Sequence, residues 1–125
     1  MSKKIIFSEN APAPIGPYSQ AILAGNLLFI SGQIALKEGV MIQDSIQAET
    51  HQVMQNIQAI LQEAGMDFNH VVKSTIFVKD LNHFQTINEI YGSYFSENPP
   101  ARETVEVSRL PKDANVEISC IALKF

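Results

Sequence analysis

The sequence has little of what several protein classes require. Its one cysteine, Cys120, excludes an internal disulfide and a cysteine-rich zinc site. No apolar run approaches the roughly 18 residues of a membrane-spanning helix. The apolar N-terminal segment meets Ser8 and Glu9 too soon to act as a secretory signal. We therefore expect a cytoplasmic protein with no membrane partner.

Strong positive charge is also missing. The formal net charge is −4, and the longest basic run is Lys3-Lys4. Nucleic acids and anionic membranes are bound through clustered Lys and Arg, so neither is an expected partner. His51, His70 and His83 share no metal-ligand spacing, and the sequence has no glycine-rich phosphate loop. The residues therefore give no sign of a metal site.

The chain does have enough apolar residues for one core. It has 125 residues, of which 46% are hydrophobic. A chain of this length buries roughly two-thirds of the surface that its unfolded form exposes. It shows no repeat, linker or low-complexity tract. We therefore expect residues 1–125 to form a single domain.

The first third of the chain predicts three strands. Residues 4–7, 19–24 and 27–34 have strand patterns, and Gly25-Asn26 suits the turn of a hairpin. Between the first two strands, three prolines in residues 12–17 exclude a helix and indicate an ordered, extended loop.

Two helices and three more strands follow. A helical apolar stripe begins near Asp44, which we expect to cap it with Gln47 in a capping box, and Gly65 ends it. Residues 71–78 are β-branched and predict a strand. A second helix is expected over residues 81–95, capped by Asp80 and ended by Pro99 and Pro100. Residues 102–107 and 115–124 predict the last strands.

The predicted order is β-β-β-α-β-α-β-β. Both helices can cover one face of a single mixed sheet of about six strands, which gives a two-layer α+β domain. The other face also needs cover, because two helices cannot bury all the apolar side chains. Association with other subunits is therefore expected.

A few polar residues occur where the pattern is apolar. Glu117 lies on a strand whose two faces both look buried, and Asn88 shares a helix face with Phe84 and Tyr91. Taken alone, these residues favour a structural ion pair for Glu117 and a core amide for Asn88. Arg102, at the start of a strand, would ordinarily be solvated.

Two further features have simple structural explanations. Tyr18 could be a packed ring, and Ser31-Gly32 could be a strand irregularity.

Several motifs, in order along nearly the whole chain, resemble the RidA (YjgF) family of enamine/imine deaminases. They are Ala13-Pro14-Ile15-Gly16-Pro17-Tyr18-Ser19-Gln20, Ser31-Gly32-Gln33-Ile34, Val78-Lys79-Asp80-Leu81, Pro100-Ala101-Arg102, Arg109-Leu110-Pro111-Lys112-Asp113 and Val116-Glu117-Ile118. The resemblance implies a chorismate-mutase-like α+β fold, assembled as a homotrimer with its sites in clefts between subunits.

The resemblance also implies a reaction without metal or cofactor. The substrates are 2-aminoacrylate and 2-aminocrotonate, or their imine tautomers 2-iminopropanoate and 2-iminobutanoate. The products are pyruvate or 2-oxobutanoate and ammonia. By this resemblance Arg102 anchors the substrate carboxylate and Glu117 holds the attacking water. The remaining substrate-binding positions are Tyr18, Ser31, Gly32, Asn88 and Thr104.

These assignments agree with elementary chemistry. A guanidinium can grip a planar carboxylate through two parallel hydrogen bonds, and an ionised Glu117 can accept a proton from water. Two positions depart from the family pattern: Thr104 replaces a frequent cysteine, and Glu103 replaces a usually small residue beside Arg102. Strand alternation predicts that Glu103 points away from Arg102.

Two other functions stay open at this stage. The same cleft could hold a small carboxylate without converting it, which would make the protein a trimeric binding module. The family has also been associated with endoribonuclease activity and inhibition of translation, but the acidic charge disfavours an RNA substrate.

Overall fold

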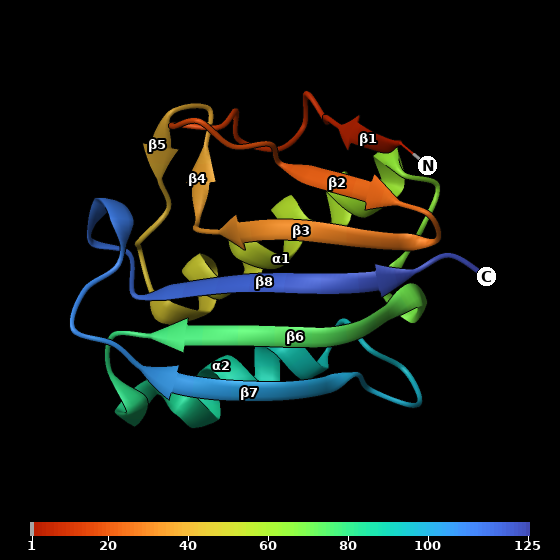
Figure 1. The fold of residues 1–125 in the computed structure, drawn as a ribbon. Helices are drawn as coiled ribbons and strands as arrows, with labels where there is room; N and C mark the ends of the chain where they lie inside the picture. Colours follow the sequence, from red (N-terminus) through yellow and green to blue (C-terminus); the bar gives the residue numbers. More distant parts are fainter. Residues whose placement is uncertain (1) are drawn as a thin grey trace.

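Six strands form one mixed sheet in the computed structural model, which describes residues 2–125 (Figure 1). The strands are β1 (Lys3–Ile6), β2 (Ala21–Ala24), β3 (Leu27–Gln33), β6 (Val71–Val78), β7 (Ala101–Glu106) and β8 (Val116–Leu123). Their spatial order is β1-β2-β3-β8-β6-β7; β6 and β7 pair in parallel, and the other four pairs of neighbouring strands in this sheet are antiparallel. The mixed sheet of six strands is therefore confirmed.

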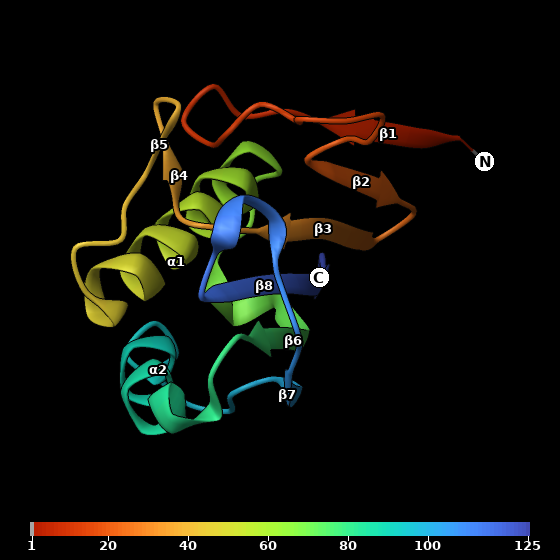
Figure 2. The same ribbon diagram turned by 90° about the vertical axis from the view of Figure 1, so that its left-hand side faces the viewer.

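Two helices pack on one face of this sheet, as predicted. They are α1 (Ile46–Glu63) and α2 (Phe84–Gly92), and Figure 2 shows both on the same side. Apolar residues of α1 such as Val53, Ile57 and Leu61 are fully buried against sheet residues such as Leu28 and Ile118. Within residues 2–125, no helix is both long and apolar enough to cross a membrane.

The start of α1 differs from the prediction. The N-cap is Ser45, whose hydroxyl accepts a hydrogen bond from the Ala48 amide at 3.0 Å. The predicted Asp44 cap with Gln47 was therefore wrong by one residue, because serine caps a helix as well as aspartate does. The predicted end is confirmed: Gly65 follows the C-cap with a φ of +73°.

The second predicted helix is divided in two. A single 3₁₀ turn, η2 (Leu81–His83), precedes α2, and the Asp80 carboxylate accepts a hydrogen bond from Asn82 N. α2 ends at Gly92, three residues before the predicted end. The structure also contains elements that the sequence did not predict: a short hairpin of β4 (Leu36–Lys37) and β5 (Val40–Met41), and the 3₁₀ turns η1 (Phe68–His70) and η3 (Pro111–Asp113).

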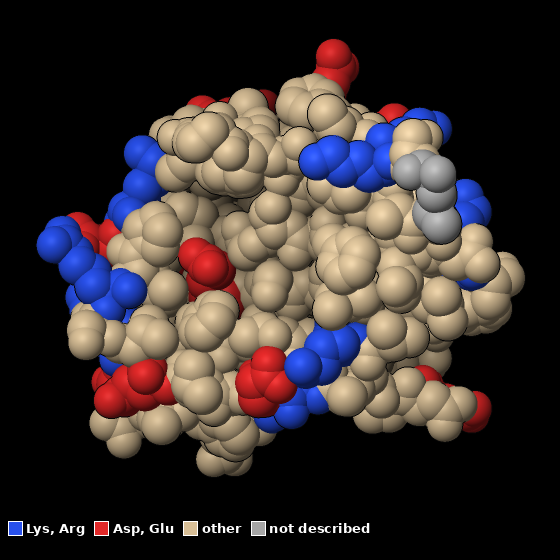
Figure 3. Space-filling model, viewed as in Figure 1, with Lys and Arg blue, Asp and Glu red and all other residues tan. Residues whose placement is uncertain are grey.

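The face of the sheet away from the helices, here called the open face, is largely apolar. Ile5, Ile22, Phe29 and Ile121 are cross-strand neighbours in one row, and Ile5 and Phe29 are exposed. In Figure 3 the centre of this face carries few charged side chains. The open-face residues of β8, such as Ile121, are only half-buried, so the prediction that both faces of the last strand are mostly buried was wrong for this face of a single chain.

Candidate functional site

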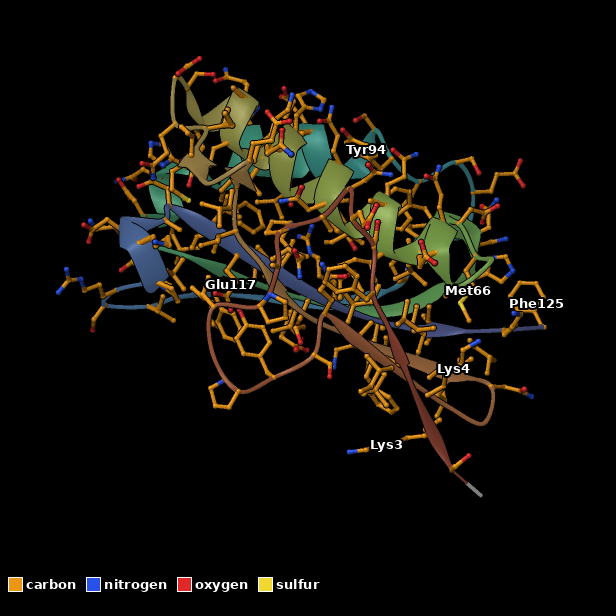
Figure 4. All side chains as sticks on the ribbon, turned by 90° about the horizontal axis from the view of Figure 1, so that it is seen from above. Lys3, Lys4, Met66, Tyr94, Glu117 and Phe125 are labelled. Atoms are coloured by element: carbon orange, nitrogen blue, oxygen red, sulfur yellow. The ribbon has the colours of Figure 1, made fainter. Side chains whose placement is uncertain are left out.

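A cleft of about 400 Å³ opens beside the start of β8. Four predicted site residues line it together: Tyr18, Ser31, Gly32 and Glu117. The other lining residues are Pro12, Ala13, Ile15, Gln20, Gln33, Ile34, Leu36 and Pro111. Figure 4 labels Glu117 and shows it close to the N-terminal loop.

The loop that forms one wall of the cleft is fixed by the buried side chain of Gln20. The Gln20 amide nitrogen donates to the carbonyls of Ser8, Ala11 and Pro12, and its oxygen accepts from Ser8 N at 2.7 Å. Buried amides need such partners. Gln20 was not predicted as a site residue, because its role depends on a loop conformation that periodicity does not reveal.

Tyr18 and Ser31 hold the loop against the sheet. The Tyr18 hydroxyl accepts a hydrogen bond from Ile15 N at 3.3 Å, and the ring is half exposed. Ser31 Oγ donates to Ser19 O at 2.6 Å. The pairing of β3 with β8 is irregular between Ile30 and Gln33. Ser31-Gly32 is therefore both a strand irregularity and part of the cleft wall.

Gly32 allows the Glu117 carboxylate to lie against the backbone of β3. A Cβ atom at residue 32 would lie 2.8 Å from the Glu117 Cδ, which is closer than real Cβ contacts. Burial raises the pKa of the Glu117 carboxyl above its ordinary value. The ion pairs formed within residues 2–125 involve His70, Lys73 and Arg109, but not Glu117. The structural ion pair considered for Glu117 is therefore absent from this part of the chain.

Arg102 belongs to a second group, on the helix-covered side of the sheet. Arg102 lies beside the fully buried Ser74 in the parallel β6–β7 pair. Its guanidinium carbon is 5.7 Å from the centroid of the Phe84 ring and 5.2 Å from that of the Tyr91 ring. Arg102 is half-buried rather than fully solvated, and it joins no ion pair within residues 2–125.

Glu103 does not neutralise Arg102. Its carboxylate accepts a hydrogen bond from Thr75 Oγ1 at 2.7 Å and pairs with Lys73 Nζ at 3.1 Å, both on the open face. The hydrogen bond from Thr75, and then Lys73, lowers the pKa of Glu103. The prediction from strand alternation is confirmed.

Asn88 and Thr104 occupy the same side of the sheet as Arg102. Asn88 is half-buried and lies between Phe84 and Tyr91 in the helical sequence, so it shares their face of α2. The Thr104 hydroxyl is buried and has no hydrogen-bond partner within residues 2–125. An unpartnered buried hydroxyl is unfavourable unless a ligand or water satisfies it.

The predicted residues thus form two separate groups in one chain. Tyr18, Ser31, Gly32 and Glu117 line the cleft, whereas Arg102, Thr104 and Asn88 lie at the β7–α2 edge. Glu117 points to the open face, since it alternates with the buried Val116 and Ile118. One chain does not bring the arginine and the glutamate together.

The remaining candidates show no catalytic arrangement. Burial raises the pKa of the Cys120 thiol to about 11, so it is a neutral core residue. His51, His70 and His83 are half-buried rather than surface residues, and His51 Nδ1 is 2.9 Å from the Tyr94 hydroxyl. Across residues 2–125, no three His, Cys, Asp or Glu side chains cluster to hold a metal ion.

The sequence and the fold match a known family along almost the whole chain. The family model described as Endoribonuclease L-PSP covers residues 8–124. A RutC family protein of Pyrococcus horikoshii is 56% identical over 124 residues, which is 98% of each chain. Reactive Intermediate Deaminase A, chloroplastic, of Arabidopsis thaliana is 46% identical over 98% of this chain and 66% of the plant protein.

Solved structures agree. The Rid protein YyfA of Yersinia pestis superposes with a TM-score of 0.95 at 46% identity, covering 98% of this chain and 99% of that one. TdcF of E. coli, solved with bound serine, gives a TM-score of 0.93 at 40% identity, with the same shares covered. The fold therefore defines a small two-layer α+β protein with a ligand-sized cleft at the sheet. The chain belongs to the YjgF/Rid family.

Proposed function

We propose that this protein is a hydrolytic deaminase of small 2-imino acids. Its substrates are 2-iminopropanoate and 2-iminobutanoate, the imine tautomers of 2-aminoacrylate and 2-aminocrotonate. The observation that carries the proposal is a pair of charged groups, Arg102 and Glu117, that are half-buried and have no ion-pair partner within residues 2–125. Unpaired, half-buried charges are costly to a fold and are characteristic of sites that bind ligands.

Two relatives support this substrate class. The Arabidopsis protein is named as a reactive intermediate deaminase, and the E. coli structure contains serine. Serine carries a carboxylate beside a nitrogen-bearing carbon, as a 2-imino acid does. A guanidinium suits that carboxylate, because its planar fork of donors can form two parallel hydrogen bonds.

The reaction needs only groups that this chain supplies. Arg102 holds the substrate carboxylate, which places the imine carbon in front of a water molecule beside Glu117. The water oxygen bonds to this carbon, the C=N electron pair moves to nitrogen, and Glu117 accepts a water proton. Glu117 returns this proton to the nitrogen, which gives a carbinolamine with one hydroxyl and one amino group. Glu117 then takes the hydroxyl proton and passes it to the same nitrogen, so that the C=O bond forms as the C–N bond breaks, and the keto acid and ammonia leave. The Thr104 hydroxyl and the Asn88 amide are polar partners for the bound acid.

The site requires more than one copy of the chain. Arg102 and Glu117 occupy opposite sides of one sheet, and the open face is an apolar surface without cover. We propose a homotrimer in which the cleft of one subunit faces the β7–α2 edge of the next. Covering the open face removes apolar side chains such as Phe29 from water, which stabilises the assembly.

The decisive test generates 2-aminoacrylate with a separate dehydratase and measures keto-acid release with and without this protein. We expect faster release, and the Arg102→Ala variant should lose the effect while keeping its circular dichroism spectrum. The matched control is Arg109→Ala, because Arg109 is exposed and its ion-pair partner within residues 2–125 is Asp113. If the native protein does not accelerate keto-acid release, the deaminase proposal is contradicted, and the function that remains is a module that binds a small carboxylate.

A further inference from the structure

The surroundings of the Arg102 guanidinium are unusual for a charged group. It contacts two aromatic rings, Phe84 at 5.7 Å and Tyr91 at 5.2 Å from the guanidinium carbon, and within residues 2–125 it pairs with no carboxylate. A guanidinium within about 6 Å of a ring centroid is attracted by the negative face of the ring. Within residues 2–125, these ring contacts leave the side-chain N–H groups of Arg102 without hydrogen-bond acceptors.

The two rings lie on the same face of α2. Phe84 and Tyr91 are seven residues apart on α2, which is a rise of about 10 Å. Both distances are below about 6 Å, so the guanidinium contacts both rings on this side of the helix. Asn88 lies midway between the rings on the same helix face.

The Tyr91 ring is itself anchored to the sheet. Its hydroxyl donates a hydrogen bond of 2.8 Å to Ser74 Oγ, and Ser74 Oγ is 3.5 Å from Cys120 Sγ. Ser74 is fully buried and lies directly beside Arg102 in the β6–β7 pair. These contacts therefore link Arg102 back to its own strand pair. The β6–β7 pairing fixes Ser74, the hydrogen bond with Ser74 fixes the Tyr91 ring, and the ring contacts the Arg102 guanidinium.

We propose that Phe84 and Tyr91 are positioning residues that hold the Arg102 guanidinium against two rings and leave its N–H groups free for a carboxylate. The identity of the ligand rests on the proposed function, whereas the positioning of the guanidinium by the two rings does not. Arginine side chains lose rotamer freedom when they bind, so a side chain already held in place binds more tightly. The rings also exclude water from the faces of the guanidinium, which strengthens its hydrogen bonds to a carboxylate.

The position of the Arg102 guanidinium against the two rings can be tested without an activity measurement. The chain has only two arginines, Arg102 and Arg109, so their Nε–H signals in a ¹⁵N NMR spectrum are readily assigned. Ring currents should displace the Arg102 signal, and Phe84→Leu should move it toward that of exposed Arg109. Arg109 serves as the internal control. An Arg102 signal that stays in place in Phe84→Leu would overturn the proposal.

The functional consequence is tested by binding and turnover. Phe84→Leu should weaken 2-oxobutanoate binding about three- to tenfold and raise KM by the same factor, with kcat within twofold. Phe84→Tyr retains a ring and should restore both. The control is Phe125→Leu, which removes an exposed ring whose partner is His70. Native affinity in Phe84→Leu would contradict the proposal, and so would a Phe84→Tyr variant that does not regain native affinity.

Tyr91 needs a paired comparison because it is buried. Tyr91→Phe keeps the ring and should leave the Arg102 signal near its native position, whereas Tyr91→Leu should move it and weaken binding. If Tyr91→Leu does not fold, the Phe84 variants still decide the question. If the native protein does not hydrolyse imines, the proposed function fails while the NMR signal still reports on the geometry.

Discussion

Glu117 combines partial burial with the lack of a basic partner within residues 2–125. Burial raises its pKa, because removing water disfavours the charged carboxylate. A raised pKa makes the ionised carboxylate a stronger base, closer to the value that suits proton transfer at neutral pH. The same environment that destabilises the charge therefore suits the role of base that we propose for Glu117.

The raised pKa predicts opposite pH dependences for activity and stability. Glu117 must be ionised to accept a proton, so kcat/KM should fall as pH falls through its raised pKa. A folded-state pKa above the unfolded value contributes stability at low pH that is lost as pH rises through the folded pKa. Glu117→Gln should abolish turnover and, at neutral pH, give a Tm no lower than native. Thermal unfolding and a kcat/KM profile check both effects.

The control for this prediction is Glu63→Gln, because Glu63 is an exposed glutamate on α1. It should change neither the pH profile nor the Tm beyond error. Native turnover in Glu117→Gln would remove Glu117 from the mechanism.

Gly32 gives a second test at the scale of one residue. A methyl group there would overlap the Glu117 carboxylate, so Gly32→Ala should displace Glu117 and reduce kcat/KM by at least tenfold. Gly92→Ala is the matched control, since a Cβ at that position would meet, among residues 2–125, no atom within 4 Å apart from its chain neighbours and its own helix backbone. We expect Gly92→Ala to keep native activity. Equal activity in the two variants would contradict the close approach.

For single residues, the sequence predicted the side of a strand or helix on which a side chain lies better than the contacts that the side chain makes. Alternation along β7 correctly placed Glu103 away from Arg102, because period-two geometry needs only the strand. The aromatic contacts of Arg102 could not be predicted, since they depend on how α2 packs on the sheet. The role of Gln20 was missed for a similar reason. Its hydrogen bonds reach loop residues that precede it by 8 to 12 positions, and this loop has no periodicity.

At the scale of elements, the buried Glu49 joins α1 to the start of β8. Its two carboxylate oxygens accept hydrogen bonds from the backbone N and the side-chain Nδ2 of Asn115, each at 2.8 Å. Glu49 is 1% exposed. Asn115 directly precedes the strand that carries Glu117, so this contact fixes one wall of the cleft.

Removal of this contact should be costly. Glu49→Ala leaves two part-buried donors of Asn115 without this partner, and we expect a loss of about 2–4 kcal/mol in the free energy of unfolding. Urea denaturation measures this loss. Glu63→Ala, at an exposed position of the same helix, should change stability by less than about 0.5 kcal/mol. A Glu49→Ala variant as stable as the control would show that Asn115 finds other partners.

Most elements were predictable because they are long and periodic. The apolar stripe of α1 and the β-branched run of β6 each repeat often enough to be recognised. The β4–β5 hairpin was missed because two residues per strand carry no period. Helix ends were less certain, as the shift from Asp44 to Ser45 shows, because neighbouring polar residues have similar capping ability.

At the scale of the whole molecule, the open face and the divided site have one common explanation. An apolar row across β1, β2, β3 and β8 needs cover, and the proposed reaction needs Glu117 near an arginine that its own chain holds on the other side of the sheet. A cyclic assembly satisfies both needs with one interface, because each copy offers a cleft to one neighbour and an edge to the other. Light scattering should give three times the chain mass of 13.9 kDa.

Mixing two inactive variants tests this arrangement directly. In trimers refolded from equal amounts of Arg102→Ala and Glu117→Gln chains, some clefts combine an intact Glu117 from one chain with an intact Arg102 from the next. Random assembly predicts that about a quarter of the sites regain both residues, so the mixture should recover about a quarter of the native rate. The control replaces Glu117→Gln by the double variant Arg102→Ala/Glu117→Gln, which cannot form any intact site. A mixture that assembles with native mass but stays inactive would place the whole site in one chain, because only sites shared between chains can be rebuilt by mixing.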